Sequence, residues 1–386
     1  MNGMTSRERL LTVIHGEIPD CVPVAPDTSN MIPARLTGKP FWDLYLYQEQ
    51  PIWAAYIDCV KRFGFDSLMD GYVPIQFEEL GEIDHEWEEM IVGRTDERIY
   101  TQRMRRAGNL TEWEDHVTVY YRADPPTSGM RPQTLGLPGT PGHWEKIEGR
   151  RPWPNGGELL KLAKGMLGDH GLFGVFCGTS LLLHNMEEIY DYYDNPGKYQ
   201  EKRDQLIEYY LKRMDVLMAQ EVQPDFICTG GSGTLVFQSP AIFRELCLPI
   251  VQAVTRKAKE YGIPTHIHSC GPETELVKIC AQETDLTIID PLEIAPMGDS
   301  DLATLKQLYG GRLILKGNLH TTDVMLRGTV QDVIDASKRA IDDAAAGGRF
   351  ILSTGDQCGR DTPDDNLFAM IETARTYGKY SPAAER

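Results

Sequence analysis

The chain has 386 residues and carries 39 Lys and Arg against 57 Asp and Glu, so its formal net charge is −18 and its isoelectric point lies near 5.0. This acidic balance argues against nucleic acid as a partner, because phosphate binding relies on basic surfaces. No apolar run reaches the roughly 18 residues of a membrane span, and the N-terminus has the pattern of a polar helix start rather than a signal sequence. We therefore expect a cytoplasmic protein that contacts no membrane.

Eight cysteines are spread along the chain without the density of a disulfide-rich secreted protein. They are Cys21, Cys59, Cys177, Cys228, Cys247, Cys270, Cys280 and Cys358. Four of them fall inside or just after short apolar runs, where a thiol packs as a small hydrophobic group. We expect reduced thiols, and core packing is the default role of each one.

Eight short β-rich runs alternate with stretches of helical spacing. The runs cover residues 21–25, 67–70, 173–177, 226–229, 264–268, 286–289, 313–316 and 350–353. The helical stretches cover about residues 5–15, 42–63, 156–168, 186–221, 239–261, 272–283, 300–309, 329–347 and 364–378. This α/β order predicts a (β/α)8 TIM barrel. An open doubly wound sheet would usually show a Gly-x-Gly-x-x-Gly motif after its first strand, and the sequence lacks it there.

About 100 residues separate the second and third predicted strands, far more than one crossover needs. The interval, roughly 75–155, contains β-prone stretches at 97–102 and 117–121 and a Pro/Gly-rich segment from 125 to 154. We interpret it as a β-rich insertion that caps the C-terminal mouth of the barrel. The whole chain, 1–386, would then form a single barrel domain with this insertion.

The fifth predicted strand carries the sharpest chemical signal. Alternation along a strand places His266, His268 and Cys270 on one face, at the end of the barrel where reactive groups of such folds gather. Imidazole and thiolate are preferred zinc ligands, and Gly271 allows a sharp turn directly afterwards. The pattern therefore predicts a zinc site, although His268 could instead be a buried structural histidine beside two packing cysteines.

A catalytic zinc site needs a third protein ligand. The end of the eighth strand offers Asp356 and Cys358, the sixth offers Glu293 and the seventh offers His320. Because thiolate is the softer donor, we favour Cys358 and expect a site of His268, Cys270 and Cys358. Asp356 and Glu293 are the alternatives.

Several motifs of the chain resemble those of the uroporphyrinogen decarboxylase superfamily. They are the segments 5–10 and 16–24, Ser239-Pro240 with Phe243 and Pro249, the segment 268–271, and the closing segment 362–366. Together they run through nearly the whole chain. The resemblance implies a (β/α)8 barrel and one of two activities: a cofactor-free uroporphyrinogen decarboxylase or a zinc-dependent cobamide methyltransferase.

The methyltransferase branch fits the residues better. True decarboxylases bind the substrate carboxylates with an early Met-Arg-Gln-Ala-Gly-Arg segment, whereas residues 25–31 contain no Arg. The methyltransferase branch has His-x-Cys on the fifth strand and a later Cys as zinc ligands, which His268 and Cys270 match. The later position departs from the family's Gly-Cys, so either Cys358 binds from a re-spaced loop, or Asp356 or Glu293 takes its place.

The resemblance thus implies a zinc-dependent methyltransferase that works with a separate corrinoid (cobalamin) protein. We expect a methoxylated small molecule, by preference an aryl methyl ether, as the methyl donor to Co(I), which would make the protein an O-demethylase component. The reverse half-reaction, from methyl-corrinoid to a thiol or folate, is the alternative. A decarboxylase using Asp27 or Asp70 beside an Arg, without metal, and a barrel without catalytic activity are the other possibilities.

Further site residues follow from their positions after the predicted strands. Asp290, Glu293 and His320 are expected to protonate or orient the reacting oxygen. Contacts to the cofactor are expected from Gly231, Ser232 and Asn318. The reactive groups of barrel folds lie at such positions, after the C-terminal ends of the strands.

Overall fold

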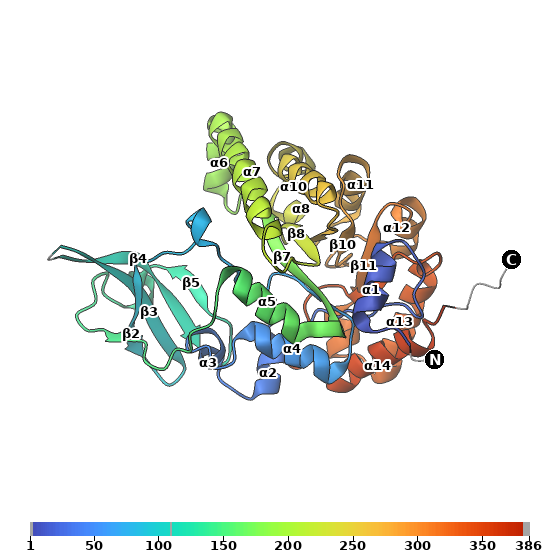
Figure 1. Ribbon diagram of the computed structural model, residues 1–386, viewed down its shortest axis with the longest axis horizontal. Helices are drawn as coiled ribbons and strands as arrows, with labels where there is room; N and C mark the ends of the chain where they lie inside the picture. The colour runs from blue at the N-terminus through green and yellow to red at the C-terminus, as the bar shows by residue number, and fades with distance from the viewer. Residues whose placement is uncertain (1–2, 109, 381–386) are drawn as a thin grey trace. The chain divides into compact units, whose positions relative to one another are not determined.

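The computed structural model describes residues 3–108 and 110–380, which fall into two compact units (Figure 1). The barrel unit takes its described residues from Met1–Thr28, Val60–Pro74 and Leu160–Arg386. The sheet unit takes its residues from Ser29–Cys59 and Ile75–Leu159, so it also includes a segment that precedes the predicted insertion.

The barrel unit contains a seven-stranded sheet in which every strand pairs in parallel with the next. Its strands, in spatial order, are β1 (Ser67–Met69), β7 (Gly171–Thr179), β8 (Phe226–Gly230), β9 (Thr265–His268), β10 (Ile288–Asp290), β11 (Ile314–Leu319) and β12 (Phe350–Thr354). Seven of the eight predicted runs therefore form regular strands, and the predicted (β/α)8 barrel is confirmed.

The remaining run, 21–25, closes the barrel through a few backbone contacts. Val24 forms a parallel bridge to Leu352 of β12. The amide of Asp66, just before β1, donates to the carbonyl oxygen of Val24 at 2.7 Å. Because Pro23 has no amide hydrogen to donate, the run forms isolated bridges instead of a continuous ladder.

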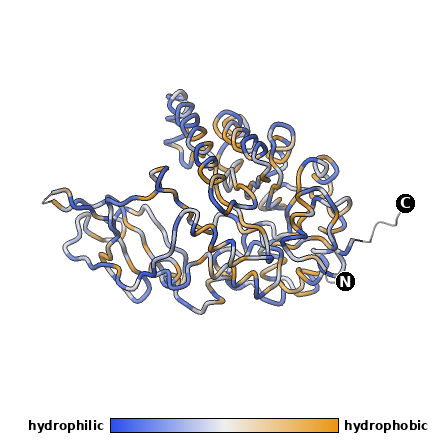
Figure 2. Tube along the Cα trace, in the orientation of Figure 1, coloured by the Kyte–Doolittle hydropathy of each residue, from blue (hydrophilic) through white to orange (hydrophobic). Residues whose placement is uncertain are grey.

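The core of the barrel receives buried side chains from strands all around it. Leu68, Leu172, Phe226, Ile288, Ile314 and Ile351, together with Ala25 and Cys228, form one buried cluster. Leu10 and Val13 of α1 (Ser6–Ile14) belong to the same cluster. Most of these strands are buried over their whole length, as strands covered on both faces are. Hydrophobic segments recur through the barrel unit (Figure 2). The packed interior leaves the C-terminal strand ends for chemistry.

Helices follow the strands as the sequence predicted, with two differences. The remaining α-helices are α2 (Met31–Thr37), α3 (Phe41–Tyr45), α4 (Ile52–Phe63), α5 (Gly156–Leu167), α6 (Met186–Asp194), α7 (Pro196–Met218), α8 (Thr234–Phe237), α9 (Pro240–Ile242), α10 (Leu248–Glu260), α11 (Thr274–Glu283), α12 (Leu302–Tyr309), α13 (Val330–Ala344) and α14 (Asp364–Thr376). The predicted helices 42–63 and 186–221 each split in two. Pro51 and Pro196 explain the breaks, since proline is compatible with the first turn of a helix but not with its interior.

The sheet unit contains a five-stranded antiparallel sheet in the order β5-β4-β3-β2-β6. The strands are β2 (Glu88–Arg94), β3 (Arg98–Ala107), β4 (Leu110–Tyr121), β5 (Thr127–Met130) and β6 (Glu145–Lys146). This sheet confirms the β-rich insertion between the second and third barrel strands. Its capping of the barrel mouth stays a prediction.

Across residues 3–108 and 110–380, the helices lack the combination of length and apolar character that crossing a bilayer requires.

Candidate functional site

Side chains from β9 and from the loops after β10 and β12 meet at the C-terminal end of the barrel. Two sets of potential metal ligands occur there: Cys270, Glu293 and Asp356, and Asp27, His268 and Asp356. Within each set the donor atoms lie within 4.8 Å of one another, and Asp356 belongs to both. We call these five residues the donor cluster.

Asp356 is positioned by an unusual backbone conformation. Its φ is 132°, a value that residues with a side chain rarely adopt. The preceding residue, Gly355, donates its amide hydrogen to the carbonyl oxygen of Leu319 at 2.7 Å, which ties the end of β12 to β11. Strained conformations of this kind tend to persist at functional sites. The turn brings the Asp356 carboxylate into the donor cluster.

Cys358, our sequence-based choice for the third zinc ligand, is in neither set of potential ligands among the described residues. Its side chain is buried, and burial raises the pKa of its thiol to about 12. Its amide donates to the carbonyl oxygen of Asp27 at 2.9 Å. Donor softness favoured Cys358 from the sequence, but the turn at residue 356 presents the Asp356 carboxylate instead. Both alternatives to Cys358, Asp356 and Glu293, belong to these sets, and the identity of the third ligand stays a prediction.

Asp290, the last residue of β10, forms the centre of a buried charge network. Its Oδ1 lies 2.9 Å from Nε2 of His266 and 3.3 Å from Nδ1 of His268. Its Oδ2 accepts a hydrogen bond from the ammonium group of Lys316 on β11. His268 pairs with Asp290 in the strand register, so neighbouring strands hold these groups together. Asp290 therefore contacts the donor cluster through His268 without belonging to it.

The network shifts the pKa values of its members in opposite directions. Burial alone would raise the pKa of Asp290, but Lys316, His266 and His268 lower it well below its ordinary value. Burial lowers the pKa of His268, whereas Asp290 and Asp356 raise it well above its ordinary value. Asp290 is therefore an ionised carboxylate, which suits a group that orients a histidine and not a proton donor.

Glu293 enters the donor cluster through the turn that follows Cys270. The amide of Gly271 donates to Oε2 of Glu293 at 2.5 Å. Burial and the nearby Asp356 carboxylate raise the pKa of Glu293. The adjacent Glu273, which our sequence analysis missed, is fully buried and accepts a hydrogen bond from the amide of Leu292. Its position two residues after Gly271 was the only available signal.

Ser232, Asn318 and His320, which were also predicted from the sequence, each make a hydrogen bond at a different place. Ser232 lies beside the donor cluster, because its Oγ is 2.8 Å from Sγ of Cys270. Asn318 donates from Nδ2 to the carbonyl oxygen of Leu292 at 3.1 Å. His320 caps the helical turn Thr321–Leu326 with its Nδ1. Contacts of Gly231, Ser232 and Asn318 with a cofactor stay predictions.

His266 belongs to a third set of potential ligands, which it forms with Asp70 and Cys228. Nδ1 of His266 lies 3.3 Å from Oδ2 of Asp70. Burial raises the pKa of Cys228 well above its ordinary value. A thiol that stays protonated is a poor metal ligand, so the donor cluster is the better candidate for a metal site.

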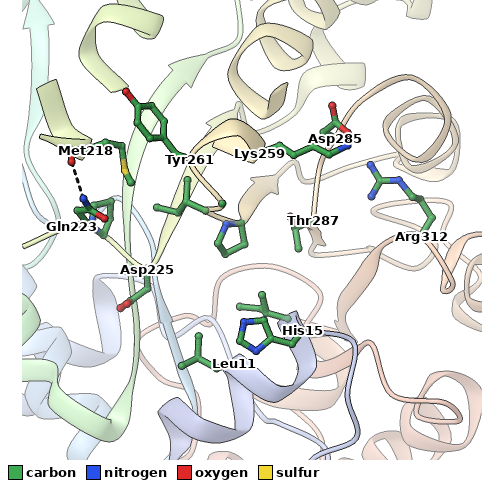
Figure 3. A pocket seen from close by; sticks show the side chains of 15 residues that line it. Leu11, His15, Met218, Gln223, Asp225, Lys259, Tyr261, Asp285, Thr287 and Arg312 are labelled. Atoms are coloured by element: carbon green, nitrogen blue, oxygen red, sulfur yellow. Dashed lines mark hydrogen bonds and ion pairs between the residues drawn. The ribbon is translucent and has the colours of Figure 1, made fainter. Parts of the chain in front are cut away.

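A cavity of about 570 Å³ lies at the opposite, N-terminal end of the barrel strands (Figure 3). Its charged groups already have partners: Lys259 pairs with Asp285 at 2.7 Å, and Arg312 donates to the carbonyl oxygens of Thr284 and Leu286. Reactive groups of barrel enzymes lie at the C-terminal strand ends. The donor cluster is therefore the candidate active site.

Comparisons with known proteins agree with this fold. Residues 191–377, just under half of the chain, match the family model described as Uroporphyrinogen decarboxylase (URO-D). The chain is 28% identical over 137 residues to the methylcobamide:CoM methyltransferase MtbA of Methanosarcina mazei, and 28% identical over 135 residues to that of Methanosarcina acetivorans. Each match covers 35% of this chain, which spans little more than a third (37%) of the length of these curated relatives.

A solved structure described as a methyltransferase from Methanosarcina mazei has the same fold over almost the full length. It covers 97% of this chain and 99% of its own, with a TM-score of 0.64 and 17% sequence identity. The chain is thus a (β/α)8 barrel with a cluster of potential metal ligands at its C-terminal end. Its resemblance to the uroporphyrinogen decarboxylase superfamily, and within it to the corrinoid methyltransferases, is confirmed.

Proposed function

We propose that the protein is a zinc-dependent methyltransferase that moves a methyl group between a small molecule and the cobalt of a corrinoid carried by a partner protein. The observation that carries the proposal is the donor cluster at the C-terminal end of the barrel. The names of the curated relatives, methylcobamide:CoM methyltransferases, support the reaction type.

The residues of the cluster fit a zinc ion. His268 offers an imidazole, Cys270 a thiolate, and Glu293 and Asp356 offer carboxylates, which are the three ligand types that zinc takes in proteins. Ligand atoms that surround a zinc ion tetrahedrally at about 2.0–2.3 Å are roughly 3.5 Å from one another. The donor atoms in each set lie within 4.8 Å of one another, so a small movement of the side chains would bring them to this spacing. His268, Cys270 and Asp356 would hold the metal, which leaves the fourth position of a catalytic zinc site open.

Neighbouring side chains orient His268 and stabilise the thiolate of Cys270 for metal binding. Asp290 accepts from Nδ1 of His268, which leaves Nε2 as the ligand atom on the side of Asp356, 3.5 Å away. Ser232 can donate a hydrogen bond to the sulfur of Cys270 and so stabilise its thiolate. When bound, zinc supplies a Lewis acid that stabilises negative charge on the oxygen or sulfur atom that loses or gains the methyl group.

We propose an aryl methyl ether as the methyl donor. A phenol has a pKa near 10, by analogy with tyrosine, so its anion leaves more readily than an alkoxide, yet it still needs charge stabilisation at neutral pH. Glu293 lies within the cluster, and its raised pKa fits a group that can hold a proton near the departing oxygen. The opposite direction, from methyl-corrinoid to a thiol, uses the same residues.

The partner follows from the size of the cofactor. A corrinoid is too large for a small-molecule pocket, so it would arrive on its own protein and present cobalt to the open end of the barrel.

All eight cysteines are free thiols, which supports a reducing compartment such as the cytoplasm.

Metal content and methyl transfer, measured on the same preparation, test the proposal. We expect about one zinc per chain and zinc-dependent demethylation of methoxyaromatics with a reduced corrinoid protein. Cys270→Ser should lose both zinc and activity, whereas Cys280→Ser, at a buried thiol on α11, should keep both. A wild-type protein that cannot be loaded with zinc, or that acts equally well without it, would favour a metal-free decarboxylase.

A further inference from the structure

A small cavity beside the end of β11 differs from the N-terminal cavity in holding buried polar atoms without partners. Its volume is about 210 Å³, and its lining includes Ser300, Asn318 and His320 with the apolar side chains of Leu302, Leu319 and Ala336. Over the part of the chain that the structure describes, Oγ of Ser300 and Nε2 of His320 are buried and have no hydrogen-bond partner. Such atoms are costly to leave unpaired, so they indicate a missing partner.

The proton of His320 is fixed on Nε2. Nδ1 accepts hydrogen bonds from the amides of Thr322 at 3.2 Å and Asp323 at 3.0 Å, so in the neutral ring the hydrogen must be on Nε2. The unpartnered atom is therefore a hydrogen-bond donor. Because its ring is anchored by two backbone amides, this donor points in a set direction.

Ser300 places the cavity next to the donor cluster. Its amide donates to the carbonyl oxygen of Glu293 at 3.0 Å, and its side chain is only 6% exposed. His320 follows β11, which pairs with the strand that leads to Glu293, and its ring is near enough to act on the pKa of that carboxyl group. A molecule in the cavity would thus lie close to the proposed metal ligands.

The size and charge of the cavity define the class of ligand. An apolar cavity of about 150 Å³ is known to hold benzene, so about 210 Å³ accommodates a ring with one or two substituents. Asp301, Arg339 and Asp343 are exposed lining residues, and they carry two negative charges and one positive charge. This balance disfavours an anionic ligand.

We propose that this cavity binds the ring of a small neutral substrate, a phenol or its methyl ether, and that His320 Nε2 and Ser300 Oγ donate hydrogen bonds to an oxygen of that ring's substituents. This assignment rests on the proposed methyl-transfer function, for which it names the substrate pocket. It makes His320 and Ser300 substrate-binding residues rather than metal ligands.

Calorimetric binding of phenol to the zinc-loaded and zinc-free protein tests the assignment, with toluene and benzoate as competitors of similar size. We expect phenol to bind more tightly than either. His320→Asn should weaken phenol binding about tenfold, the effect of one hydrogen bond, without changing toluene binding, because asparagine still caps the following turn. Ser300→Ala should act similarly, and Ala336→Leu should block all three ligands.

His15→Asn, in the N-terminal cavity, is the matched control and should bind phenol like the wild type. Equal binding of phenol and toluene, or unchanged phenol binding in both His320→Asn and folded Ala336→Leu, would overturn the assignment. Phenol binding that follows our expectations in a protein without methyl transfer would overturn the proposed function alone. Methyl transfer from an aryl ether at an undiminished rate in His320→Asn and Ala336→Leu would overturn the cavity assignment alone.

Discussion

Nδ1 of His268 lies 3.3 Å from Oδ1 of Asp290, a carboxylate that is almost completely buried. The pairing fixes the orientation of the imidazole, and it couples the donor cluster to a charge in the barrel interior. That charge is balanced by Lys316, which is also buried and contacts the other oxygen of Asp290. The geometry of the donor cluster and the stability of the barrel therefore depend on the same residue.

The first prediction concerns this coupling. Asp290→Asn keeps the shape of the side chain but removes the carboxylate that pairs with the buried Lys316 ammonium group, so we expect the free energy of unfolding to fall by about 3–5 kcal/mol. Urea denaturation measures it. The double variant Asp290→Asn/Lys316→Met should recover a large part of the loss. A double variant no more stable than the single one would show that the charge pair is not the cause.

The second prediction distinguishes the candidates for the third zinc ligand. Cys270→Ser and Asp356→Asn should each release zinc to a chelator at concentrations that the wild type withstands, because hydroxyl and amide oxygens are poorer zinc ligands than thiolate and carboxylate. Cys358→Ser should retain zinc, since Cys358 lies outside both sets of potential ligands. Zinc loss in Cys358→Ser as large as in Cys270→Ser would restore the assignment that donor softness suggested.

This difference shows where sequence reasoning reaches its limit. Alternation along one strand predicts that His268 and Cys270 share a face, because a strand has a fixed period of two residues. Asp356, a candidate for the third ligand, lies on a loop after a different strand, and its φ of 132° accompanies the turn that brings its carboxylate into the cluster. No residue pattern predicts such a value for an aspartate.

The fold itself follows from the sequence much more directly. Runs of buried strand residues and amphipathic helices recur along the chain, and seven of the eight runs form strands where they were expected. The network of His266, Asp290 and Lys316 escaped prediction, since it depends on the register between three neighbouring strands. Register is set by tertiary packing and is only weakly visible in one sequence.

The third prediction concerns acid stability at the N-terminal end of the barrel. Burial raises the pKa of Asp20, but the hydrogen bond and charge of Arg9, at 2.7 Å, lower it to about 2. A carboxyl group with a depressed folded-state pKa stabilises the protein above its unfolded pKa near 4, and this contribution is lost as pH falls toward 2. At pH 6 the free energy of unfolding of the wild type should therefore exceed that of Asp20→Asn by about 1 kcal/mol.

The stability difference between wild type and Asp20→Asn should shrink steadily between pH 4 and pH 2. Denaturant unfolding at several pH values measures it. A difference that stayed constant over this interval would mean that Asp20 titrates normally in the folded protein.

The last prediction concerns the turn at Gly271, the residue that follows Cys270. Gly271 has a φ of 97°, and a Cβ atom at this position would lie 2.4 Å from Cγ2 of Val236. Its amide also holds Glu293. Gly271→Ala should therefore shift the backbone beside Cys270, lower the free energy of unfolding by about 1–3 kcal/mol and weaken zinc binding.

Gly262→Ala provides the matched comparison for this turn. Gly262 has a φ of 69°, but a Cβ atom there would meet no atom within 4 Å, and the residue lies in the turn before β9, at the N-terminal end of the barrel. Backbone strain alone should thus cost Gly262→Ala about 1 kcal/mol and leave zinc affinity unchanged. Zinc affinity, measured by competition with a chelator, separates the two effects. Equal zinc affinity in both variants would mean that the Gly271 turn supports the fold without positioning Cys270 and Glu293 for the metal.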